Sequence, residues 1–166
     1  MIEFLLKTVI SCAISVSEDL AYVFLIPQSR EKRKPLIDLL ANENVGKCAH
    51  NMKFEDNWSK VRLRQKVKNW LWDTMLAAHI IDNRTGVTSL KFLVYVLFGI
   101  IDYESEVSPY LQAKEEGANS LNQIEKLIQT KEGVKALLYY NGLDAIYEYR
   151  VAKLQMELFY NNTLPF

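Results

Sequence analysis

Polar and apolar positions follow one another in blocks along this chain, and the first blocks have the character of β-strands. Residues 8–16 and 20–26 are rich in β-branched and aromatic side chains, with a polar turn at residues 17–19 between them. Paired runs around a short polar turn are typical of antiparallel strands. Pro27, which cannot donate to a strand ladder, closes the second run. The pattern predicts two antiparallel strands.

The next blocks alternate between helical and strand-like spacing. Apolar residues at 36, 37, 39 and 40 follow Pro35, which predicts an amphipathic helix with proline in its first turn. Residues 45–49 predict a short strand, and a helix begins in residues 54–61. The order of these elements is β-α-β.

A fourth strand-like run at residues 70–72 leads into helical spacing at residues 75–81, and Asp73 or Thr74 could cap that helix. Strands that alternate with helices in this way predict an α/β domain.

The rest of the chain is mainly helical. Segments with helical spacing occupy residues 89–98, 121–129 and 134–159. Gly99 ends the first of these helices, and residues 101–120 are acidic and irregular, which predicts a surface loop. We expect Asn141-Gly142 to interrupt the last helix.

Length and charge narrow the class of protein. A chain of 166 residues that is 49% hydrophobic can bury one core, so we expect a single domain over residues 1–166. Twenty basic and twenty acidic side chains cancel, which excludes a strongly basic nucleic-acid binder. Alternating basic residues at 60–68 indicate a solvated face or, alternatively, a local contact with phosphate.

Cysteine usage and hydropathy bear on the compartment. Cys12 and Cys48 lie in apolar runs without metal-type spacing, so we interpret them as free core thiols. The apolar run at residues 93–101 is much shorter than the roughly 18 residues that a membrane span requires. The amino terminus lacks the pattern of a signal peptide. We therefore expect a cytoplasmic protein without a membrane partner.

Two groups of residues carry candidate chemistry. Tyr140 and Asp144 are four residues apart, which puts a phenol and a carboxylate on one helix face. A carboxylate can hold a divalent cation, and a phenol can orient the water that the cation activates. Nine tyrosines make such a pair common by chance, so an amphipathic helix is the alternative. The second group, Asn51-x-x-Phe54-Glu55, ends a short strand with polar side chains.

The order of four segments adds a resemblance. Ala49-His50-Asn51-Met52-Lys53-Phe54-Glu55, Trp72-Asp73-Thr74-Met75-Leu76-Ala77-Ala78-His79, Ser89-Leu90-Lys91 and Tyr140-Asn141-Gly142-Leu143-Asp144 stand in that order. Together they resemble the proofreading 3'-5' exonuclease domain of family-A DNA polymerases, in phage-like or prophage-like form, over roughly residues 8–159. The resemblance implies an RNase H-like fold with a mixed sheet flanked by helices. It also implies hydrolysis of a single-stranded DNA 3' end by two divalent ions, Mg²⁺ or Mn²⁺, and a polymerase domain as partner.

The resemblance assigns roles residue by residue. Glu55 stands where the second motif has its metal-binding acid, usually Asp, and Asp56 is a substitute. Asn51, Lys53 and Phe54 would lie near the terminal nucleotide. Asp144 would be a metal ligand and Tyr140 would orient the attacking water, so Tyr140, Asp144 and Glu55 are the expected catalytic residues. Asp73 is interpreted as a structural cap close to the site.

The first motif of that family, Asp-x-Glu, has no full counterpart in this chain. Glu3 is the only candidate for a remnant, and Met1 stands where the Asp should be. We therefore expect an amino-terminally incomplete domain in which the first strand is missing or altered. Two cations about 3.5–4 Å apart need several carboxylates to neutralise them. Metal binding should then be weak or single, and hydrolysis impaired.

Alternatives remain open. The chain could be a catalytically inactive remnant that binds a DNA end or mononucleotide, or that scaffolds a polymerase domain. An exposed sheet edge could also pair two copies into a homodimer. His50 and His79 fit packed core positions better than metal ligation. Trp58, Trp70 and Trp72 could stack bases, but core packing is the better interpretation for at least two of them.

Overall fold

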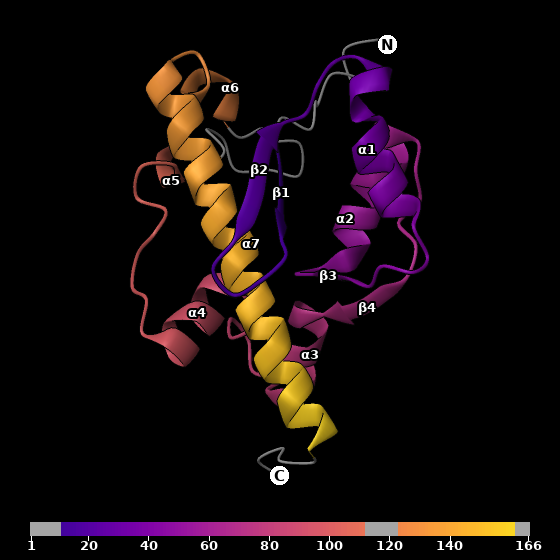
Figure 1. The fold of residues 1–166 in the computed structure, drawn as a ribbon. Helices are drawn as coiled ribbons and strands as arrows, with labels where there is room; N and C mark the ends of the chain where they lie inside the picture. Colours follow the sequence, from indigo (N-terminus) through magenta and orange to yellow (C-terminus); the bar gives the residue numbers. More distant parts are fainter. Residues whose placement is uncertain (1–10, 112–122, 162–166) are drawn as a thin grey trace.

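The computed structural model describes residues 11–111 and 123–161 of the chain. Figure 1 shows the long helix α7 (Lys131–Tyr160) running the length of the molecule, with the β1–β2 hairpin lying along it. The strands are β1 (Ser11–Ser15), β2 (Ala21–Leu25), β3 (Lys47–Ala49) and β4 (Trp70–Asp73). The other helices are α1 (Arg30–Ala41), α2 (Met52–Trp58), the π-helical turn η2 (Ser59–Leu63), α3 (Thr74–Ile81), α4 (Leu90–Phe98), α5 (Ser108–Leu111) and α6 (Ile124–Leu127).

The four strands form an antiparallel pair and a parallel pair. β1 pairs with β2 in a register that sets Ser11 opposite Leu25. β3 pairs in parallel with β4, and the register shifts between Lys47 and Cys48. Within the described residues each pair is a separate sheet of two strands. These strands and the covering helices make an α/β fold, and the hairpin and the β3 and β4 strands are where the sequence predicts them.

Helix α7 joins the two strand pairs because it packs on both of them. The hairpin lies against its middle, where Asn141 hydrogen-bonds Ser11 of β1. Farther along α7, the buried Gln155 accepts a hydrogen bond from the Trp72 indole of β4 and donates one to the backbone oxygen of Thr74, both at 3.0 Å. Figure 1 shows β4 and α3 beside this later part of α7.

Two helix boundaries correct the sequence prediction. Helix α1 begins at Arg30, so Pro35 lies inside the helix and not in its first turn. The first turn is polar and exposed, and therefore leaves no apolar periodicity to detect. Helix α7 passes without interruption through Asn141-Gly142. Glycine costs a helix only about 1 kcal/mol, and the bare Gly142 backbone lets Val23 of β2 approach closely.

The caps near the site agree with their sequence signals. The Asp73 carboxylate accepts from the backbone N–H groups of Met75 and Leu76, which confirms it as the cap of α3. Ser89 caps α4, and Gly99 ends that helix at a φ of 69°.

A hydrophobic cluster closes the molecule beside the start of α7. Its buried members are Val107, Ile124, Leu127 and Leu137. It fixes α5 and α6 against α7, although the sequence predicts an irregular loop around α5. Residues 112–120 of that predicted loop, and residues 121–122 of the helix predicted to follow it, lie outside the described residues. No helix within 11–111 and 123–161 combines the length and apolar character of a membrane span.

Candidate active site

Tyr140 and Asp144 lie on the same face of α7, as their spacing predicts. The Tyr140 hydroxyl hydrogen-bonds the Asp144 carboxyl group. Both side chains are half-buried. The pairing that the sequence indicates is therefore present, and the phenol contacts the carboxylate directly.

Tyr103 is a second phenol on the same carboxyl group, which the sequence prediction missed. Its hydroxyl donates to Oδ1 of Asp144 at 2.8 Å. The ring stacks on Tyr140, with centroids 6.1 Å apart and an interplanar angle of 22°, and it also contacts Tyr147 at 5.0 Å. Tyr103 belongs to the predicted loop, and no local pattern connects it to a helix 41 positions away.

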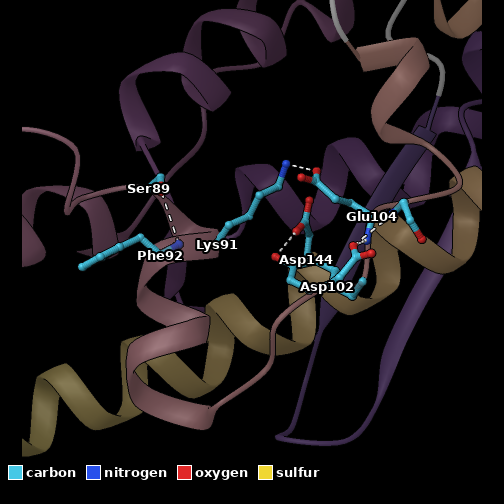
Figure 2. A network of polar contacts seen from close by, with 8 residues as sticks. Ser89, Lys91, Phe92, Asp102, Glu104 and Asp144 are labelled. Atoms are coloured by element: carbon cyan, nitrogen blue, oxygen red, sulfur yellow. Dashed lines mark hydrogen bonds and ion pairs between the residues drawn. The ribbon is translucent and has the colours of Figure 1, made fainter.

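The segment 102–105, which follows α4, is held in place by its own turn and by Lys91. Asp102 Oδ1 accepts from the backbone N–H groups of Glu104 and Ser105 at 2.9 and 3.1 Å. Lys91 of α4 forms an ion pair with Glu104, and its ammonium lies 5.9 Å from the Tyr140 ring centroid. Figure 2 shows Lys91, Glu104 and Asp144 turned toward one another. The segment thus bridges α4 and α7.

The electrostatics of Asp144 reflect both its burial and its partners. Burial raises the pKa of Asp144, while the hydrogen bonds from Tyr103 and Tyr140 and the charge of Lys91 act in the opposite direction, and the net pKa is raised. The pKa values of both tyrosines are strongly raised, first by burial and then by Asp144. The two phenols therefore keep their protons and act as donors to this carboxyl group.

Glu55 approaches the site from α2. Its side chain is exposed to solvent, yet the surrounding protein raises its pKa by desolvation. Its charge acts on Cys12 of β1 and on Glu148 of α7. Glu55 and Asp144 thus both act on Glu148, and no cation among the described residues forms an ion pair with Glu55.

Glu148 is a carboxyl group that the sequence prediction did not select. The pKa of Glu148 is raised to about 8, mainly by burial and then by the charges of Glu55, Asp144 and Asp73, against a hydrogen bond from the His50 backbone. Its spacing of four residues from Asp144 could have indicated it. Among the alternating polar residues of a long helix, however, it has the pattern of a solvated face.

The residues expected near a terminal nucleotide lie at the start of α2. Asn51 adopts the left-handed conformation, with φ 71°, and its side chain accepts from the backbone of Phe54 at 3.4 Å as the helix cap. Lys53 is exposed. Phe54 is 53% exposed and meets Trp58 edge-on at 6.0 Å. Asp56, the substitute for Glu55, accepts from the Val67 backbone and pairs with Lys60.

Asp73 ties the site to its scaffold. Besides capping α3, its carboxylate accepts from the backbone N–H groups of Asn51 at 3.1 Å and Met52 at 3.0 Å. His50 is half-buried and its Nδ1 lies 2.8 Å from the Thr74 hydroxyl, in line with a packed histidine. His79 is exposed, so its prediction as a core residue is wrong. Helix α3 has apolar side chains on most of its faces but buries only some of them, and His79 lies on a face that is exposed to solvent.

The cysteines are free thiols, as the sequence predicts. Burial raises the pKa of Cys12 to about 11, with Glu55 adding to the shift. Such a thiol stays protonated and unreactive at neutral pH.

The donor set does not fit a centre of two divalent ions. Among residues 11–111 and 123–161, no three His, Cys, Asp or Glu side chains form a group that could hold a metal ion. Glu3, the candidate from the first motif, lies outside the described residues. Asp144, which the sequence predicts to be a metal ligand, already accepts hydrogen bonds from two phenols.

Residues 5–158, which include every residue of this site that the structure describes, match the family model for the 3'-5' exonuclease domain of family-A DNA polymerases. No curated protein matches the chain.

Proposed function

This chain belongs to the family of 3'-5' exonuclease domains of family-A DNA polymerases, and we propose that it binds the 3' end of single-stranded DNA and hydrolyses it only feebly. The family is metal-dependent and has the RNase H-like fold. Hydrolysis of a 3'-terminal nucleotide needs Mg²⁺ or Mn²⁺, which would activate water and stabilise the charge that develops on the phosphate. In this chain Asp144 and Glu55 would be the ligands, with Glu3 as a third candidate.

The hydrogen bonding of Asp144 is the observation that supports impairment. The carboxyl group receives two phenol donors, and the described residues supply no group of three ligands around it. Two closely spaced cations repel each other unless several carboxylates surround them. Weak binding of a single ion, and slow hydrolysis, follow from this shortage of ligands.

DNA binding depends on different side chains. The exposed Phe54 ring offers a face on which a terminal base can stack, and the neighbouring Lys53 can contact a phosphate. Asn51 fixes the backbone from which both side chains project. Binding can therefore persist where hydrolysis is poor.

A binding test addresses this part of the proposal. We expect Phe54→Ala to weaken binding of a 3'-tailed oligonucleotide roughly tenfold, since base stacking on an aromatic ring contributes about 1–3 kcal/mol. Fluorescence anisotropy measures the affinity. Tyr160→Ala is the matched control, because Tyr160 is 80% exposed at the far end of α7. Equal affinities of wild type and Phe54→Ala would contradict the assignment.

A catalytically inactive remnant is the second candidate, in which the domain binds a DNA end or nucleotide, or supports a polymerase domain. The same shortage of ligands favours it. Nucleotide release from a 3'-tailed oligonucleotide, with Mg²⁺ and with Mn²⁺, separates the two functions when wild type is compared with Asp144→Ala. Slow release that Asp144→Ala abolishes supports impaired hydrolysis, and the absence of release above background in wild type and Asp144→Ala alike supports the remnant. Release near about 10 s⁻¹, a common turnover rate, would contradict both.

We also propose the polymerase domain as partner and hold a homodimer as an alternative. In the described part of the chain, β1 and β3 each pair with one neighbouring strand only, and open strand edges can pair with a second chain. Light scattering at high protein concentration tests the dimer. A mass equal to one chain at all concentrations would exclude it.

A further inference from the structure

The contacts of Tyr103 carry an inference about what stabilises this site. Its hydroxyl reaches Asp144 Oδ1 at 2.8 Å, and its ring is held between Tyr140 and the buried Tyr147. Tyr147 in turn stacks on Phe98 of α4, with centroids 6.5 Å apart. These ring contacts fix the direction of the Tyr103 hydroxyl. The hydrogen bonds from the backbone N–H groups of Glu104 and Ser105 to Asp102 also hold the backbone on either side of Tyr103.

The negative charge of the half-buried Asp144 carboxylate has lost part of its hydration and needs stabilising contacts from the protein. In a metal centre a bound cation provides it, and here the nearest described cation, Lys91, is already paired with Glu104. The remaining groups that face Asp144 are the hydroxyls of Tyr103 and Tyr140 and the acid Glu148. Glu148 repels a negative charge, and the charge of Lys91 stabilises it without a hydrogen bond, so the stabilising hydrogen bonds come from the two phenols, which we name the tyrosine clasp.

We propose that Tyr103, through the tyrosine clasp, does for Asp144 what a bound cation does in a metal centre, so that this site is organised without divalent metal. The inference rests on the proposed function, because it takes Asp144 to be a residue of the exonuclease site. It also explains why the acidic segment after α4 is held so close to α7, since Tyr103 is a positioning residue that fixes Asp144. Tyr140, the other half of the clasp, lies on the same helix as Asp144 and cannot tie two elements together. Tyr103 joins segment 102–105 to α7.

The first test compares thermal unfolding of the full chain in EDTA and in excess Mn²⁺. A ligand that binds only the folded state raises the midpoint, and a weakly bound single ion raises it little. We therefore expect wild type to fold in EDTA with a midpoint only slightly below that in excess Mn²⁺, because the tyrosine clasp already stabilises Asp144. A wild-type midpoint that rises with Mn²⁺ by much more than roughly 5 °C, and no longer does so in Asp144→Asn, would overturn the inference.

The second test removes one oxygen atom. Tyr103→Phe keeps the ring and its stacking but deletes the donor, so we expect the midpoint in EDTA to fall by roughly 5 °C, the loss typical of a hydrogen bond to a charged group in a chain of this size. Tyr139→Phe makes the same chemical change one residue before Tyr140, on a side chain that is 69% exposed, and should leave the midpoint unchanged. Equal midpoints for the two variants would overturn the inference.

A double-mutant cycle distinguishes the hydrogen bond from general packing. In an Asp144→Ala background, Tyr103→Phe should cost much less than it does in wild type, since its acceptor is gone. An undiminished cost in this background would show that Tyr103 acts through packing alone and would overturn the inference. If Asp144→Ala does not fold, Asp144→Leu replaces it, because Leu has a similar volume and no acceptor. Failure of the Phe54→Ala binding test, with the clasp results intact, would contradict the proposed function and leave the clasp standing.

Discussion

At the scale of single residues, the carboxyl groups of this site differ in the hydrogen-bond donors that stabilise their negative charge. Asp73 receives four backbone N–H groups, and Asp144 receives two phenols. Glu148 receives one backbone hydrogen bond and is surrounded by other acids. It is therefore the residue at which folding stability should depend most on pH.

The first prediction concerns Glu148. Its pKa is raised from 4.5 to about 8, so the folded protein binds more protons than the unfolded chain between these values. The free energy of unfolding should therefore fall as pH rises through this range, by at most about 1.4 kcal/mol per pH unit for one proton. The raised pKa values of Asp144 and Glu55 act with the same sign. Glu148→Gln should flatten the dependence and be more stable than wild type at the upper end.

Urea unfolding at a series of pH values measures this effect. Glu125→Gln, which changes an exposed carboxyl group on α6, is the matched control and should keep the wild-type dependence. A slope that is the same in Glu148→Gln and in wild type would contradict the assignment.

The residues that the sequence could predict are those whose partners are local. Tyr140 and Asp144 are one helical turn apart, and Asp73 caps the helix that follows it, so spacing alone indicates both features. Tyr103 contacts a residue 41 positions away, which a periodic pattern cannot reveal. Glu148 has a helical spacing from Asp144, but that spacing does not distinguish a buried carboxyl group from an exposed one. The hydrogen bonds that Asp73 accepts from the backbone N–H groups of Asn51 and Met52 also join distant segments, so the sequence does not predict them.

At the scale of elements, the close packing of α7 against its neighbours decides which of its glycines can be replaced by a larger residue. A Cβ at the buried Gly133 of α7 would collide with the backbone oxygen of Leu127 in α6. A Cβ at Gly142 would meet only a side-chain methyl of Val23, at 3.0 Å. The same helix thus offers one rigid and one yielding contact.

The second prediction uses this contrast. Gly133→Ala should lower the free energy of unfolding by about 3 kcal/mol, because the α6 backbone must move. Gly142→Ala is the control and should be nearly neutral, since a gain of about 1 kcal/mol in helix propensity offsets a small shift of Val23. Chemical denaturation of both variants checks the prediction. Equal costs would mean that α6 does not press against α7 in this way.

The sequence predicted an element correctly where its apolar periodicity agreed with its capping or turn residues, as in α3, α4 and the hairpin. It was wrong where one of these two signals was missing or misleading. The first turn of α1 is polar and therefore has no apolar stripe, and Asn141-Gly142 resembles a helix stop although packing on β2 carries α7 through it. Packing against a distant strand outweighs a local preference of this size.

At the scale of the whole molecule, α7 is the element that connects two separate strand pairs. The hairpin packs on its middle, α3 packs on its later part, and Trp72 of β4 contacts Gln155 and Phe159 there. Gln155 is 3% exposed and links α7 to both β4 and α3, through Trp72 and Thr74. Because the pairs share no ladder within the described residues, each can loosen from α7 by itself.

The third prediction follows from this division. Gln155→Leu keeps the volume but leaves the Trp72 indole N–H without its acceptor, at a cost of about 1–3 kcal/mol, and it removes the side-chain donor that the Thr74 oxygen has in addition to its bond within α3. Native-state hydrogen exchange should then show lost protection in β3, β4 and α3, while β1 and β2 keep theirs. Lys153→Leu is the matched control on the exposed side of α7, where it removes the ion pair with Glu18. A uniform loss of protection across both strand pairs would show that the molecule opens as one unit, and would contradict the role of α7 as a bridge between two parts.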